Sequence, residues 1–212
     1  MNCAYCTSQA CQTRCREGLP ENCPMEDAGR VEADCSCYHQ EENQDFYADS
    51  IESMKQSFGK MPRIIEAVNF CRLRGYKKIG VAYCSGALKK GIAVAQIFEK
   101  HGFEVVSVGC KLGGFSPGEL IDNLPERPVQ GAAGRPKRAI CNPIGQARFL
   151  NEQKTDFNVV VGLCVGHDSL FFRYSHAPVT VVVLKDRLFP HQSDPSEQAA
   201  MEWSQPLCEI EL

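Results

Sequence analysis

Apolar runs alternate with amphipathic stretches along the chain from about residue 45 onward. Four short runs are rich in valine or other apolar residues and do not alternate with polar positions: Lys78–Cys84, Phe103–Cys110, Phe157–Cys164 and Val179–Leu184. Runs of this kind are typical of strands that are buried on both faces, as in a parallel sheet covered by helices. The pattern therefore predicts an α/β domain built around a small parallel sheet.

Amphipathic stretches between the runs predict the covering helices. Pro62–Arg74 begins with a proline suited to a first turn, and Gly86–His101 has a broad apolar stripe; a glycine follows each. Another helix is expected to begin at Asn142-Pro143, an N-cap residue followed by a first-turn proline. Right-handed crossovers favour a doubly wound, Rossmann-like sheet with strand order 2-1-3-4.

The chain is expected to have three parts. Residues 1–40 contain hardly any valine, leucine or isoleucine and cannot build a core, so they are interpreted as a cysteine-rich metal-binding module. Residues 41–190 form the three-layer α/β domain, and residues 191–212 form a polar C-terminal tail. Within the domain, residues 115–139 are dense in proline and glycine and are interpreted as an excursion over the functional site.

Cysteine is the unusual component, with 13 residues in 212, seven of them among the first 37. The odd count and the lack of an apolar leader favour a reducing compartment, where clustered thiols are more often metal ligands than disulfides. Cys3 and Cys6 form a C-x2-C pair, which lets one turn offer two thiolates to the same ion. Two further ligands are needed from Cys11, Cys15 and Cys23. We prefer Cys11 and Cys23, because Cys15 is also explained as a helical neighbour of Cys11.

The predicted sheet topology brings a second group of cysteines together. Cys84, Cys110 and Cys164 each end a predicted strand, and in a parallel sheet such ends share one edge with strands about 4.8 Å apart. Cys141 precedes the Asn142 cap and so lies near the positive end of a helix, which favours thiolate. Any single one of these thiols could be a packing residue. Together they predict a second metal or cluster site at the carboxyl edge of the sheet.

Several neighbours could take part in chemistry at that edge. His167 follows Cys164 by three residues and could be a ligand, a proton donor or a turn residue. Lys111 and Lys185 would bring cations to the same edge, either to stabilise thiolates or an anionic substrate or as ordinary solvated charges. Backbone amides at Ser85-Gly86 and Gly113-Gly114 could approach a sulfur. Asp168 is expected to cap the helix that follows Cys164.

Composition excludes several function classes. The net charge of −3 and isoelectric point of about 6.0 give no support for a general nucleic-acid binder. Apolar runs fall short of the roughly 20 residues that a membrane-spanning helix needs. We therefore expect a cytoplasmic protein that binds neither nucleic acid nor membranes. The oligomeric state is left open.

Several separated motifs resemble one prokaryotic family. They are the opening Cys-Ala-Tyr-Cys with Cys11 and Cys23-Pro24, Gly-Val-Ala-Tyr-Cys84-Ser, Cys141-Asn-Pro and Gly-Leu-Cys164-Val-Gly-His-Asp. Through these motifs the chain resembles the family named domain of unknown function 1847. Separately, Cys84-Ser-Gly and Cys110 are distantly similar to zinc-binding domains named for an Asp-Gly-Cys motif. The resemblance implies metal binding through cysteines. Cys15, Cys35 and Cys37 do not match the family pattern, so the role of Cys35 and Cys37 stays open.

Three functions are consistent with these features. The first is a protein that binds an iron–sulfur cluster or zinc at both cysteine sites and serves redox transfer, with a redox partner protein, or metal sensing. The second is an enzyme in which an open cluster iron acts as a Lewis acid, as in dehydratases or desulfidases, while His167 or Lys111 moves protons. The third is a structural zinc protein that acts through a partner surface. The sequence does not separate zinc from iron, since both accept four thiolates.

Overall fold

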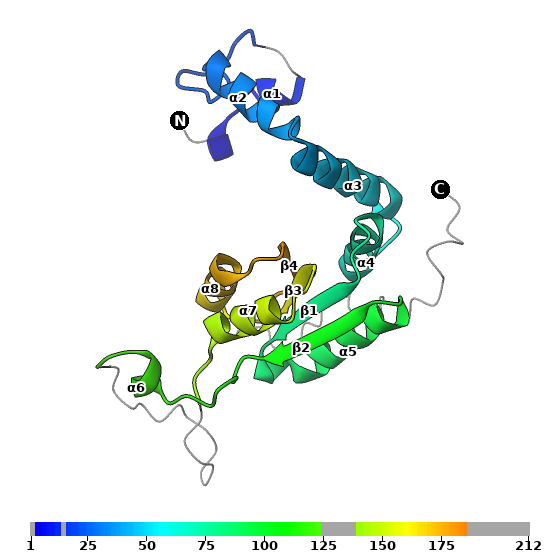
Figure 1. Cartoon of the computed structure of the whole chain (residues 1–212). Coiled ribbons are helices and arrows are strands. Elements are labelled where there is room, and N and C mark those ends of the chain that lie inside the picture. Colours follow the sequence, from blue (N-terminus) through cyan, green and yellow to red (C-terminus); the bar gives the residue numbers. More distant parts are fainter. Residues whose placement is uncertain (1–2, 14–15, 124–138, 186–212) are drawn as a thin grey trace. The chain divides into compact units, whose positions relative to one another are not determined.

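The computed structural model describes residues 3–13, 16–123 and 139–185, and the chain divides into two compact units, residues 1–52 and 53–212 (Figure 1). The first unit contains the short helices η1 (Cys3–Tyr5) and α1 (Ala10–Thr13), α2 (Ala28–Tyr38) and most of α3 (Glu41–Ser57). The expected module of residues 1–40 lies within this unit. Cys15, most of the expected excursion at 115–139 and the expected tail at 191–212 lie outside the described residues.

The second unit is built on a four-stranded parallel sheet. Its strands are β1 (Lys78–Tyr83), β2 (Glu104–Gly109), β3 (Phe157–Val161) and β4 (Val179–Val183), in the order β2-β1-β3-β4. The helices are α4 (Arg63–Leu73), η2 (Ser85–Ala87), α5 (Leu88–Lys100), α6 (Pro117–Leu120), α7 (Pro143–Glu152) and α8 (Val165–Tyr174). The predicted α/β class, parallel pairing and strand order are confirmed.

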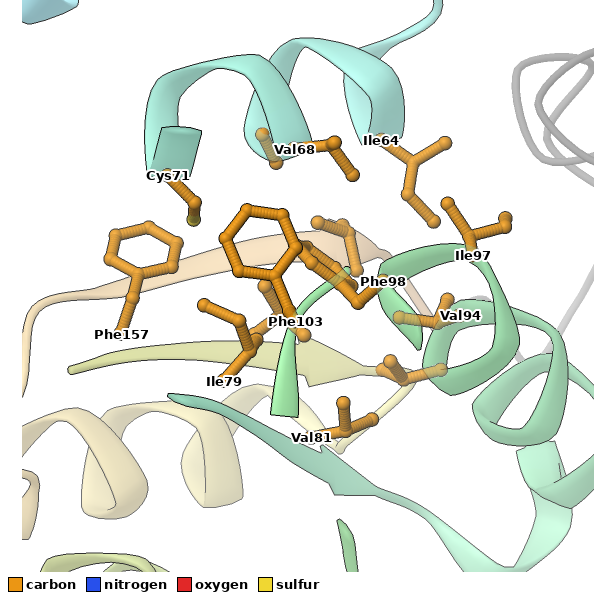
Figure 2. Close-up of a cluster of buried hydrophobic side chains, with 14 of the residues drawn as sticks. Ile64, Val68, Cys71, Ile79, Val81, Val94, Ile97, Phe98, Phe103 and Phe157 are labelled. Carbon is orange, nitrogen blue, oxygen red and sulfur yellow. The ribbon is translucent and has the colours of Figure 1, made fainter. Parts of the chain in front are cut away.

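Helices cover both faces of the sheet, as in doubly wound folds. Figure 2 shows one face, where Val68 of α4 and Phe98 of α5 pack over Val81 of β1. On the other face Leu150 of α7 and Phe171 of α8 belong to a second buried cluster with strand residues. The two apolar layers bury the central strands β1 and β3 on both faces, as their continuous apolar runs predicted. The same prediction is wrong for β2, an edge strand in which only Val108 is buried.

The start of α7 agrees with its predicted cap. Asn142 Oδ1 accepts a hydrogen bond of 2.8 Å from the Gly145 N–H, and Pro143 occupies the first turn. Gln146, in the same helix and fully buried, donates from Nε2 to the carbonyls of Tyr83 (3.3 Å) and Val108 (2.9 Å). The amide thereby fixes the start of α7 against the carboxyl ends of β1 and β2.

The prediction that Asp168 caps α8 is wrong. The N-cap position belongs to Cys164, which has an extended backbone and lies three positions after the last residue of β3. The Cys164 carbonyl accepts from the N–H groups of His167 (2.7 Å) and Asp168 (2.9 Å). Asp168 therefore lies in the first turn, where a carboxylate is favoured by the helix dipole.

Candidate functional site

The carboxyl edge of the sheet holds Cys84, Cys110, Cys141 and Cys164, which we call the sheet-edge cysteine group. The hydrogen-bond ladder continues one residue beyond β1 and β2: Cys84 N–H donates to the Val161 carbonyl and Cys110 N–H to the Tyr83 carbonyl, both at 3.0 Å. These bonds place the two cysteines at neighbouring strand ends, as the parallel register requires. Cys164 follows β3 at the start of α8.

Cys141 reaches this edge from the segment before α7. The N–H of Asn142 donates to the Cys110 carbonyl at 2.8 Å, and the Cys141 sulfur lies 3.7 Å from the Cys110 sulfur. Two thiolates on a tetrahedral zinc ion, with Zn–S bonds of about 2.3 Å, are about 3.8 Å apart. The spacing of this pair therefore fits two ligands of one metal ion.

Backbone amides of η2 point at the sulfurs. The Ser85 N–H donates to Cys110 Sγ at 3.3 Å and the Gly86 N–H to Cys84 Sγ at 3.4 Å. These contacts agree with the expectation that amides at Ser85-Gly86 approach a sulfur. The second expected pair was Gly113-Gly114, where the Gly114 N–H donates instead to the Lys111 carbonyl at 3.0 Å.

Two lysine side chains contact the cysteine group. Lys185, after β4, places Nζ 2.7 Å from Cys84 Sγ and 3.8 Å from Cys164 Sγ, so its ammonium lies between these two sulfurs. Lys111 donates to Cys141 Sγ at 3.4 Å. Hydrogen bonds from ammonium groups favour thiolate over thiol. The edge is thus arranged to hold negative sulfur.

The thiols of Cys84 and Cys110 differ in how readily they lose a proton. A hydrogen bond from the Cys110 thiol, supported by Lys185 and the Gly86 N–H, lowers the pKa of Cys84 to about 4, although burial acts in the opposite direction. The same hydrogen bond raises the pKa of Cys110, and burial adds to that rise. Cys84 is therefore a thiolate near neutral pH, while Cys110 keeps its proton.

In the metal-free protein, alkylation of Cys84 by iodoacetamide should depend on pH in an unusual way. The rate follows the thiolate fraction, so a lowered pKa should bring it to a plateau by about pH 6 rather than above pH 9. Lys185→Met should shift the profile to higher pH, because one of the groups that lowers the pKa is removed. The rate is read from the Cys84 peptide by mass spectrometry. Lys111→Met, which alters a contact to Cys141, is the control and should leave the Cys84 profile in place.

The first turn of α8 adds two further ionisable groups. They are His167 and Asp168. Burial raises the pKa of Asp168, and the nearby charges of His167 and Lys185 oppose this with a smaller lowering. Within the described residues, Asp168 Oδ1 is buried without a hydrogen-bond partner. Sequence reasoning assigned Asp168 to a cap and missed its place beside Lys185. The catalytic roles suggested for His167 and Lys111 stay predictions.

The cysteines do not form a ready metal cage as they stand. Across residues 3–13, 16–123 and 139–185, no three Cys, His, Asp or Glu side chains have the arrangement of a metal site. At the sheet edge the Lys185 ammonium contacts the sulfurs of Cys84 and Cys164. The role of the four sheet-edge cysteines as ligands stays a prediction.

The same holds for the predicted N-terminal site. Cys3 and Cys11 are exposed, whereas Cys6 and Cys23 are partly buried. The Cys6 N–H donates to the Cys3 carbonyl at 3.2 Å, so one turn carries this pair. In the described part of the chain these four side chains do not have the arrangement of a metal site, and their role as ligands stays a prediction.

Among the described helices, none combines the length and the apolar character that a membrane span requires.

Comparisons with known proteins place the chain in a family. No solved structure matches it. An uncharacterized protein of Methanocaldococcus jannaschii is 37% identical over 195 residues, which cover 91% of each chain. The model of a family described as protein of unknown function (DUF1847) matches residues 23–182, a stretch that includes Cys23 and the whole sheet-edge cysteine group. The chain therefore belongs to the DUF1847 family, as its cysteine motifs indicated.

Proposed function

We propose that the sheet-edge cysteine group binds a thiophilic metal ion or an iron–sulfur cluster and serves redox transfer or metal sensing. The observation that carries the proposal is the meeting of four cysteines from four separate chain segments, with two ammonium groups against their sulfurs. Thiols that merely fill a core need no cations beside them. Thiolates held at a partly buried edge, in contrast, need positive charge, which a metal ion also supplies.

The donor set fits zinc or iron. All four side chains offer sulfur, the ligand that both metals accept in tetrahedral sites. Four thiolates around a divalent ion carry a charge of about −2, which Lys111 and Lys185 would balance. For all four to share one ion, the Lys185 side chain must leave the gap between Cys84 and Cys164.

A second candidate is an enzyme with an open metal position. Hydrogen bonds and the 3.7 Å contact join Cys84, Cys110 and Cys141, whereas the ammonium of Lys185 intervenes before Cys164. A cavity of about 460 Å³ lies at the carboxyl ends of β1 and β2; Ser85 and Lys111 line it together with Leu88, Leu112 and Phe149, whereas none of the four cysteines does. Three thiolates would leave one position where the metal polarises a small substrate. In this candidate Lys111 would hold the charged end of the substrate or move a proton.

For the first unit we propose a separate metal site made by Cys3, Cys6, Cys11 and Cys23. The turn that joins Cys3 to Cys6 and the few buried apolar residues of this unit support it. A small module without a core is stabilised by a metal when it folds around one.

Metal analysis of the anaerobically purified full chain tests the main proposal. A brown protein with broad visible absorption indicates an iron–sulfur cluster, and a colourless protein with stoichiometric zinc indicates a zinc site. Cys164→Ser then separates the two candidates: a four-cysteine site should lose its metal, whereas a three-cysteine site should keep it. A wild-type chain that holds neither metal after anaerobic reconstitution would contradict both.

A further inference from the structure

The last turn of α2 carries a cysteine and a histidine on the same face. Cys35 and His39 are four residues apart, and Cys35 Sγ lies 3.8 Å from His39 Nε2. Residues at this spacing are neighbours on a helix surface, so the pair is held by one rigid turn. Both side chains are exposed to solvent, and neither belongs to the cysteine sets proposed above.

The spacing of the two donor atoms fits a single metal ion. Zinc binds thiolate sulfur at about 2.3 Å and imidazole nitrogen at about 2.0–2.1 Å, which in tetrahedral geometry places sulfur and nitrogen about 3.6 Å apart. The observed distance of 3.8 Å is slightly longer than this value, and a small rotation of either side chain closes the difference. The helix therefore presents two ligands in place before any ion arrives.

The electrostatic surroundings favour a cation at this position. His39 is the C-cap of α2, where the aligned peptide dipoles give the helix its negative end. Residues 1–52 contain 11 aspartates and glutamates against three arginines and no lysine. A strongly acidic unit raises the local concentration of cations.

We propose that Cys35 and His39 form a binding site for an exchangeable thiophilic divalent ion such as Zn²⁺. Two protein ligands leave the other tetrahedral positions to water, so the ion enters and leaves more readily than from a four-cysteine site. Such a site suits uptake of metal from solution. It does not rest on the function proposed for the sheet edge, since its residues and geometry are separate.

Zinc protection against alkylation tests the site in the full-length protein. With zinc present, iodoacetamide should modify Cys35 at least about tenfold more slowly than without it, because a metal-bound thiolate is a poor nucleophile. His39→Ala should abolish this protection. Both rates are read by peptide mass spectrometry, which resolves one cysteine at a time and so does not depend on metal bound elsewhere.

Cys37 provides the matched control on the same helix. It lies two positions after Cys35, which turns it to another side of α2, beside Tyr38 and Tyr47. Its alkylation rate should not respond to zinc. Equal protection of Cys35 in wild type and His39→Ala, or equal protection of Cys35 and Cys37, would overturn the proposal. The substituted side chain is exposed, and unchanged helix content by circular dichroism confirms that the fold persists.

Discussion

Replacing Cys84 by serine is expected to remove the metal from the sheet-edge cysteine group and to leave any metal in the first unit in place. Cys84 is central to the group because its sulfur is hydrogen-bonded to Cys110, to the Gly86 N–H and to the Lys185 ammonium. A serine hydroxyl stays protonated and binds zinc or iron far more weakly than thiolate does. Metal per chain, measured by mass spectrometry after anaerobic purification, should fall by the full content of one site.

Cys71→Ala is the matched control for this loss. Cys71 is a residue of α4 whose side chain points into the core, as Figure 2 shows, and burial raises its pKa to about 12, so it stays a neutral packing thiol. Its removal should lower stability and leave the metal content unchanged. If Cys84→Ser retained the metal content of the wild type, a shared site at the sheet edge would be refuted.

The second unit could be predicted well because its signals are local and repeated. The uninterrupted apolar runs of β1 and β3 are buried on both faces, as is typical of central strands in a parallel sheet between helix layers. Once the order 2-1-3-4 is accepted, Cys84 and Cys110 must lie at adjacent strand ends. The cap at Asn142 likewise depends on residues three apart in sequence. Periodicity and topology were sufficient for these features.

Other features of the site depend on side chains far apart in sequence. Lys185 and Cys84 are separated by 101 residues, yet their contact is the shortest in the group. The sequence placed a lysine at the correct edge, but side-chain reach and rotamer decide which sulfur it contacts. Asp168 was misassigned for a similar reason, since the turn after β3 is tight enough for Cys164 itself to take the cap position.

The first unit shows the opposite limit. The helix α2 has no buried residue, so its sequence contains no apolar face from which its packing could be predicted. The pairing of Cys35 with His39 arises from helical spacing, a signal that was present in the sequence but became visible once the helix boundaries were known. Where a core is missing, cysteine spacing indicates ligands without indicating their arrangement.

Gly80→Ala should destabilise the second unit by about 3 kcal/mol. Gly80 lies within β1 opposite Asn158 of β3, and a methyl group there would overlap Asn158 Oδ1 and lie 2.8 Å from Leu150 Cδ1. Asn158 is fully buried and cannot simply move, because it accepts from Thr155 Oγ1 and donates to Ser175 Oγ, both at 2.8 Å. The substitution therefore combines overpacking with the loss of a buried hydrogen bond.

The free energy of unfolding from urea titration measures this effect. Gly166→Ala is the matched control: it lies in the first turn of α8, a methyl group there meets no atom within 4 Å, and the change should stay within about 0.5 kcal/mol. A loss below about 1 kcal/mol for Gly80→Ala would mean that β1 can shift away from β3. In that case the backbone that positions Cys84 is less rigid than its hydrogen bond to the Val161 carbonyl indicates.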